Sequence, residues 1–236
     1  MEENFYLDFN NQKIFVHLTW PKNQGVFPAL IFFHGSGGSN HHSFDFLVDN
    51  LKEKFVCLSF DHLGHEKSSG QLRDFTLEDK LEQAKFVLKF LLEKEFVDKE
   101  NISFIGSSMG AHIACRLTEF FSPKNLILRA PACYRKDYER VKMIPGWLPG
   151  DEENKSWPQK PSLALESLRK FNGRLLIIES EKDEVIPKSL INDFFNTAVN
   201  VSQKKIEVIK DAPHKIRDKQ QFLDDFLKFV REFLNQ

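Results

Sequence analysis

The stretch Ile102-Ser103-Phe104-Ile105-Gly106-Ser107-Ser108-Met109-Gly110-Ala111-His112-Ile113-Ala114 decides the fold of this chain. It reads as a short apolar strand that runs through the pattern G-x-S-x-G into an amphipathic helix. A serine on so sharp a turn adopts a strained backbone conformation, and Gly106 and Gly110 leave the room that this turn needs. Only Ser108 has glycine on both sides at this spacing. The pattern predicts that Ser108 is a nucleophile raised above the edge of a sheet.

The same five residues could also form a plain tight turn, because small residues favour turns and G-x-S-x-G is a common pattern. The apolar strand before the turn and the helix after it favour the nucleophile, since the motif carries meaning only in that context.

Length and charge narrow the class of protein. The chain has 236 residues and a net charge of −1, which fits a single α/β domain over 1–236 and gives no basic surface for nucleic acid or acidic membranes. No apolar run suitable for a signal peptide follows Met1-Glu2-Glu3-Asn4, and no stretch approaches the roughly 18 apolar residues of a membrane span. We therefore expect no integral membrane association.

Three cysteines, Cys57, Cys115 and Cys133, are odd in number and widely spaced. This arrangement argues against a disulfide framework or a zinc site and for a reducing compartment. The expected location is the cytoplasm.

Strand-like and helix-like segments alternate along the chain. Residues 5–9 and 14–20 suggest an antiparallel pair around a turn at Asn10-Asn11. Further strands are predicted at 29–33, 55–60, 102–106, 126–128, 174–178 and 205–209, and helices at 44–54, 76–94, 111–120, 162–170, 189–197 and 219–234, with Thr76 as a helix cap. The order predicts an α/β fold: a doubly wound, mostly parallel sheet with helices on both faces.

A proline-rich stretch at 131–161 interrupts this alternation and predicts a short cap over one end of the sheet. Its apolar residues could line an acyl pocket or simply pack the cap onto the sheet; they are Met143, Ile144, Trp147, Leu148 and Trp157.

A glycine-rich loop, His34-Gly35-Ser36-Gly37-Gly38-Ser39, follows the predicted strand at 29–33. Attack by Ser108 on a carbonyl creates an oxyanion, which needs two fixed N–H donors. The amides of Met109 and Ser36 are the predicted pair, and His34 is expected to hold the loop. The alternative is a flexible glycine turn without a ligand.

Serine needs a base to accept its proton, and histidine is the usual one. Of eight histidines, His214 is best placed, because it lies just after the last predicted strand and before the last helix. His41 and His42 are expected at the rim of the site or exposed to solvent, and His112 is expected to pack within its helix.

The base needs an acid that orients it. Four carboxylates follow the strand at 174–178, namely Glu179, Glu181, Asp183 and Glu184. Asp183 is favoured, because the apolar Val185-Ile186-Pro187 can fix the loop behind it and because the chain order is then Ser, Asp, His. The three glutamates suit a solvated surface at least as well.

Together these segments resemble the α/β-hydrolase superfamily: the loop from His34 to Gly38, the turn at Gly106–Gly110, the segment Asp183-Glu184-Val185-Ile186-Pro187, and His214. The stretch Asp61-His62-Leu63-Gly64-His65-Glu66-Lys67-Ser68 is similar to the family's D-x-x-G-H-G-x-S loop, with Glu66 where glycine is usual. Ser180 likewise replaces a glycine common before the acid.

The predicted reaction is two-step acyl transfer to water, in which Ser108 forms an acyl-enzyme with a small carboxylic ester or thioester. It needs no cofactor and no metal. A peptidase or amidase on the same residues is an alternative, as is a non-catalytic binding module on a hydrolase scaffold. Haloalkane or epoxide hydrolysis is disfavoured, because it needs an aspartate at position 108. The sequence does not indicate an oligomeric state.

Overall fold

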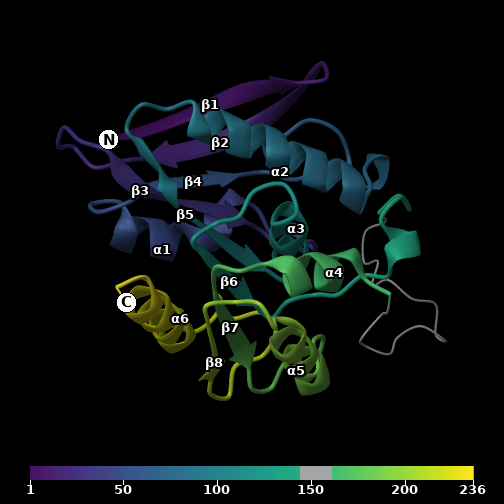
Figure 1. Ribbon diagram of the computed structural model, residues 1–236. Helices are drawn as coiled ribbons and strands as arrows, with labels where there is room; N and C mark the ends of the chain where they lie inside the picture. Colours follow the sequence, from purple (N-terminus) through teal and green to yellow (C-terminus); the bar gives the residue numbers. More distant parts are fainter. Residues whose placement is uncertain (144–160, 236) are drawn as a thin grey trace.

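One eight-stranded sheet organises the molecule, with its strands in the order β1-β2-β4-β3-β5-β6-β7-β8 (Figure 1). The computed structural model describes residues 1–143 and 161–235. The strands are β1 (Glu2–Phe9), β2 (Gln12–Thr19), β3 (Phe27–Phe33), β4 (Val56–Phe60), β5 (Val97–Ser107), β6 (Asn125–Arg129), β7 (Arg174–Ser180) and β8 (Gln203–Ile209). In the order of the sheet, the neighbours from β4 to β8 are parallel, and among the described strands only the pairs β1–β2 and β2–β4 are antiparallel. The predicted mostly parallel sheet is confirmed.

Helices cover both faces of the sheet, as predicted. In Figure 1, α1 (Asp45–Leu51) and α6 (Gln220–Leu234) lie on one side of it. The other side carries α2 (Leu77–Leu92), α3 (Met109–Leu117), α4 (Leu163–Lys170) and α5 (Lys188–Thr197). Two separate apolar clusters, one under each set of helices, form the core. The sheet is thus buried between two helical layers, which leaves the carboxyl ends of its parallel strands to present a site.

Two predicted local features are confirmed. Asn10 and Asn11 both have positive φ, 50° and 61°, as the central residues of a tight hairpin turn require, and Phe9 pairs with Gln12. Thr76 caps α2: its Oγ1 accepts the Asp79 N–H at 3.0 Å, and the Asp79 carboxylate accepts the Thr76 N–H at 2.8 Å.

Some boundaries differ from those predicted. The helix after the serine begins at Met109 rather than Ala111, because the sharp turn lets Met109 and Gly110 form its first turn. It ends at Leu117, three residues early, where the Thr118 hydroxyl donates to the Cys115 carbonyl at 2.7 Å. β5 begins at Val97, so polar residues that the apolar pattern excluded belong to this strand.

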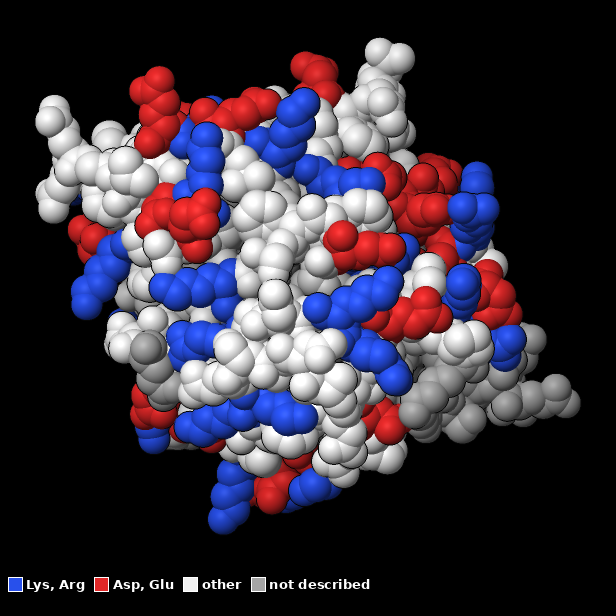
Figure 2. Space-filling model, in the orientation of Figure 1, with Lys and Arg blue, Asp and Glu red and all other residues white. Residues whose placement is uncertain are grey.

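Most of the predicted cap, 144–160 with Ile144, Trp147, Leu148 and Trp157, lies outside the described residues. Met143 is buried, and its N–H donates to the Phe75 carbonyl at 2.9 Å. On the face shown in Figure 2, basic and acidic side chains are interspersed. Within the described ranges, no helix is both long and apolar enough to cross a membrane.

Candidate active site

The turn between β5 and α3 places Ser108 in a conformation that L-residues rarely adopt, with φ 54° and ψ −117°. Steric contacts exclude a side chain at Gly106 and at Gly110. A β-carbon on Gly106 would lie 2.5 Å from the Gly110 carbonyl oxygen, and one on Gly110 would lie 1.9 Å from the Phe33 carbonyl oxygen. The strained turn that the pattern predicted is therefore present at Ser108.

His214 lies next to this serine, although 106 residues separate the two along the chain, and Asp183, 31 residues before His214, lies on the other side of its ring. His214 Nε2 is 3.2 Å from Ser108 Oγ, and Nδ1 is 2.8 Å from Asp183 Oδ2. An ionised carboxylate only accepts hydrogen bonds, so the His214 proton belongs on Nδ1. The lone pair of Nε2 then faces the serine hydroxyl.

Asp183 is held as an ionised acceptor. Its Oδ1 accepts the N–H groups of Val185 and Ile186 at 2.8 and 2.7 Å. Burial alone raises the pKa of Asp183, but the hydrogen bond and charge of His214 and these two N–H groups outweigh it, so the pKa lies below its usual value. The apolar residues that favoured Asp183 in the sequence thus act through their backbone amides.

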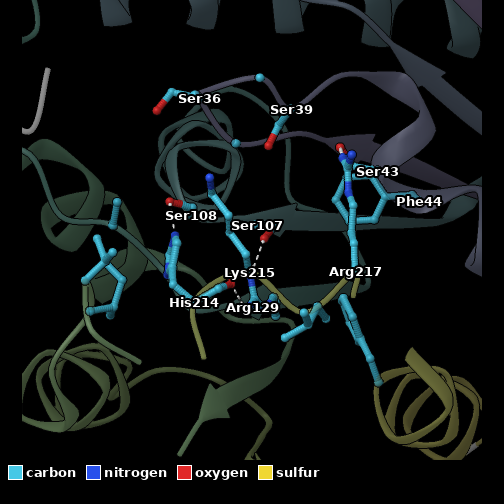
Figure 3. A pocket seen from close by; sticks show the side chains of 18 of the residues that line it. Ser36, Ser39, Ser43, Phe44, Ser107, Ser108, Arg129, His214, Lys215 and Arg217 are labelled. Atoms are coloured by element: carbon cyan, nitrogen blue, oxygen red, sulfur yellow. Dashed lines mark hydrogen bonds between the residues drawn. The ribbon is translucent and has the colours of Figure 1, made fainter. Parts of the chain in front are cut away.

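The glycine-rich loop passes directly over the serine. A β-carbon on Gly35 would be 3.4 Å from Ser108 Cβ, and Gly37 and Gly38 have φ values of 66° and 82°. Figure 3 shows Ser36 and Ser39 on this loop across the cavity from Ser108 and His214. Met109 is the first residue of α3, where backbone N–H groups have no intrahelical acceptor. Both predicted oxyanion donors therefore belong to segments that border Ser108.

With this geometry in view, sequence comparison decides the family: a model of the alpha/beta hydrolase fold matches residues 28–151, more than half of the chain. The chain belongs to the alpha/beta hydrolase family. A comparison with curated proteins gives no significant match.

Solved structures resemble this alpha/beta hydrolase over nearly its whole length. Est1E from Butyrivibrio proteoclasticus with ferulic acid bound has 22% identity and a TM-score of 0.73, with 98% of this chain and 97% of that chain covered. A monoacylglycerol lipase from Paleococcus ferrophilus has 18% identity and a TM-score of 0.70, covering 94% and 98%. The thioesterase domain of the curacin biosynthetic pathway has 13% identity and a TM-score of 0.69, covering 100% of both chains. Identities this low show a shared fold.

Arg129, which the sequence reasoning missed, supports the histidine of this alpha/beta hydrolase. It is 5% exposed at the end of β6, and its guanidinium donates to Ser180 Oγ at 2.8 Å, to Ser107 Oγ at 3.3 Å, and to the Pro213 and His214 carbonyls. Burial lowers its pKa to about 10, with Asp183 and Glu184 acting in the opposite direction. The sequence signal that could have identified Arg129 is its position, as a charged residue directly after the apolar run at 126–128.

Two further departures have local explanations. Ser180, where the family more often has glycine, supplies the hydroxyl that Arg129 contacts. Glu66, where glycine is usual in the family's loop, has a positive φ of 38°, so the backbone keeps a conformation that favours glycine. Glu184 also has a contact that sequence reasoning did not assign, because its Oε2 accepts the His214 N–H at 2.9 Å.

The expectation for His41 is wrong. His41 is 2% exposed, and its backbone N–H and its Nδ1 lie 2.7 and 2.8 Å from Asp61 Oδ1. Asp61 follows β4, which pairs with β3, so the sheet brings it beside a residue 20 positions earlier.

His42 is exposed as expected and pairs with Asp45 at 2.7 Å. His112 is buried within α3 as expected, and its Nε2 forms a hydrogen bond with Glu139 Oε1 at 2.9 Å.

Three buried histidines lie at the glycine-rich loop: His34, its first residue, and His62 and His65, which follow β4. His34 Nδ1 is 2.6 Å from the Gly35 carbonyl, and its Nε2 accepts the His62 N–H at 3.0 Å, so a neutral His34 holds the loop. His65 Nδ1 is 3.2 Å from the Ser39 carbonyl. Burial lowers the pKa of His34 to about 4, that of His65 to about 2, and that of His62 well below its usual value, and the charge of nearby Lys80 adds to this effect.

We predict that acid destabilises the protein through these histidines. Unfolded histidine titrates near pH 6.5, whereas His34 stays neutral in the fold down to a pH of about 4. Between those values the unfolded chain binds more protons, so the free energy of unfolding falls as pH falls. Together, His34, His62 and His65 contribute at most about 4 kcal/mol per pH unit to the pH dependence of the free energy of unfolding. Urea unfolding at pH 7, 6 and 5 measures the slope.

His65→Asn retains a donor for Ser39 and should reduce that slope by at most about 1.4 kcal/mol per pH unit, the contribution of one histidine. His42→Asn provides the comparison, because the same substitution is made at an exposed histidine outside this cluster. A free energy of unfolding that stays constant between pH 7 and 5 would contradict the prediction.

Proposed function

We propose that this alpha/beta hydrolase cleaves a carboxylic ester or thioester through an acyl-enzyme on Ser108. One observation carries the proposal: Ser108, held at a φ of 54°, lies 3.2 Å from His214 Nε2, while Asp183 holds His214 Nδ1 at 2.8 Å. A nucleophile, its base and an orienting acid within hydrogen-bond reach are what acyl transfer by serine requires.

In the proposed first step, Ser108 Oγ attacks the acyl carbonyl while its proton moves to His214 Nε2. The resulting imidazolium is stabilised by ionised Asp183, whose lowered pKa keeps it charged at neutral pH. The backbone N–H groups of Ser36 and Met109 would bind the oxyanion. One such donor contributes about 3–4 kcal/mol of transition-state stabilisation.

His214 then gives this proton to the leaving alcohol or thiol as its bond to the acyl carbon breaks, which completes the acyl-enzyme and the first half of the cycle. In the second half, His214 accepts a proton from water as the water oxygen attacks the acyl-enzyme, and returns it to Ser108 Oγ as the carboxylic acid leaves. Every proton transfer in these steps passes through His214 Nε2. This role requires the position that His214 has beside Ser108.

A fluorophosphonate probe tests the proposal, because it reacts with activated serines and forms a stable adduct. We expect one adduct per chain, mapped by peptide mass spectrometry to Ser108 rather than to neighbouring Ser107. Protein heated until unfolded provides the control and should not be labelled. A folded protein that the probe leaves unmodified would favour the non-catalytic binding module instead. A panel of esters and matched thioesters then separates the two substrate classes.

A further inference from the structure

The cavity at Ser108 carries an excess of positive charge. It has a volume of about 400 Å³, and its charged lining residues are Arg129, Lys215, Arg217 and Asp218. Three of these are cations and one is a carboxylate. Apolar side chains form much of the remaining wall, among them Phe44, Leu223 and Phe226. The cavity therefore combines an apolar surface with fixed positive charges close to the serine.

Arg129 is not available to a ligand. Its guanidinium is buried and donates to two hydroxyls and two backbone carbonyls, and its charge faces Asp183 and Glu184. This cation is a structural part of the site. The excess charge that a ligand would meet comes from the other two cations.

Lys215 and Arg217 are both exposed, and neither forms an ion pair within the part of the chain that the structure describes. Arg217 donates to the neutral hydroxyl of Ser43. Figure 3 shows the Lys215 side chain extending toward the glycine-rich loop near Ser108, and the Arg217 side chain reaching across to Ser43 and Phe44. Asp218 lines the same cavity, and the charge of Asp45 acts on Arg217. Both cations thus border the cavity with spare hydrogen-bond donors.

We propose that the substrate of this hydrolase carries an anionic group, a carboxylate or a phosphate, that Lys215 and Arg217 bind. The inference rests on the proposed function and adds to it the charge of the substrate. A cavity whose lining carries an excess of one sign of charge concentrates ions of the opposite sign. The planar guanidinium of Arg217 can bind two oxygens of a carboxylate or phosphate, and Lys215 adds a point charge. The apolar wall at Phe44, Leu223 and Phe226 suits the hydrocarbon between anion and carbonyl.

Two chromogenic esters of equal chain length test this inference: 4-nitrophenyl hexanoate and the 4-nitrophenyl monoester of hexanedioic acid, which differ only in a terminal carboxylate. We expect the wild-type protein to favour the anionic ester by about tenfold in kcat/KM, chiefly through KM, which corresponds to about 1.4 kcal/mol. The preference should shrink as ionic strength rises. The double variant Lys215→Gln/Arg217→Gln should lose it.

Lys210→Gln is the matched control, because Lys210 is an exposed cation that does not line the cavity. Protection of Ser108 from the fluorophosphonate gives a second readout that needs no turnover. Hexanedioate, inorganic phosphate and uncharged hexan-1-ol are compared as protecting ligands. The stronger of the two anions identifies carboxylate or phosphate as the preferred group, and hexan-1-ol measures protection without a charge. The double variant should lose protection by either anion.

A wild-type protein that prefers the hexanoate ester, or a double variant that keeps both the anionic preference and the protection, would overturn the inference and leave the proposed function standing. Failure to hydrolyse either ester together with an unlabelled Ser108 would overturn the proposed function, and this inference with it.

Discussion

Replacement of Ser108 by alanine is expected to lower kcat for ester hydrolysis by on the order of 10⁶-fold. The variant loses the proposed nucleophile, while the proposed oxyanion donors, the N–H groups of Ser36 and Met109, remain together with the cavity. A residual acceleration of about 10³–10⁴-fold over water is therefore expected from the remaining groups. Steady-state hydrolysis of a 4-nitrophenyl ester measures the loss, with unfolding in urea as a check on stability.

Ser108→Ala and His214→Ala should reduce the rate by comparable factors, and the double variant should lose little more, because nucleophile and base act as one unit. Ser122→Ala provides the control, since Ser122 is an exposed serine whose hydroxyl donates to Asn172 at 3.1 Å. Multiplicative losses in the double variant, or a Ser108→Ala protein with near wild-type turnover, would contradict the assigned roles.

Gly110→Ala is expected to be the most damaging glycine-to-alanine change among the glycines that the structure describes. The added carbon would lie 1.9 Å from the Phe33 carbonyl oxygen and 2.6 Å from the His34 carbonyl oxygen. These are backbone atoms of the central strand and the glycine-rich loop, so α3 has to move away from β3. We expect a loss of about 3 kcal/mol or more, and thus a decrease in Tm of about 6–12 °C.

Gly37→Ala separates this steric effect from backbone strain. An added carbon at Gly37 would meet no atom within 4 Å, but the residue has a φ of 66°. Its substitution should therefore cost only about 1–2 kcal/mol, from the left-handed conformation alone. Thermal unfolding of both variants gives the comparison, and a Gly110→Ala protein as stable as Gly37→Ala would show that α3 and β3 adjust more freely than their packing indicates.

The sequence predicted best those features that neighbouring residues determine. The turn at Ser108, the Asn10-Asn11 hairpin and the Thr76 cap each depend on a few adjacent residues, and each occurs where it was expected. The order of strands and helices was enough to predict the doubly wound sheet, because few topologies satisfy right-handed crossovers. Ser108, Asp183 and His214 each follow a parallel strand. Because ligands bind at the carboxyl ends of such strands, the three residues could be predicted to lie close together.

Contacts between distant segments could not be predicted. His41 pairs with Asp61, and Arg129 donates to the carbonyls around His214, only because the sheet brings those strand ends together. A charged residue inside an apolar pattern suggests a solvent-facing strand end, whereas the structure buries Arg129 among hydroxyls and carbonyls. Glu184 shows the same difficulty: its role as acceptor for the His214 N–H depends on how two loops lie side by side.

The position of β8 at the edge of the sheet has a consequence for how activity is lost. Among the strands that the structure describes, β8 pairs with β7 alone, and most of its residues are partly or fully exposed. His214 lies in the segment that joins this edge strand to α6, whereas Ser108 follows β5, which has a strand on each side. Edge elements open at lower free energy than central ones. Fraying of β8 and α6 would separate base from nucleophile while the central strands stay folded, so activity should disappear at a lower denaturant concentration than the core structure.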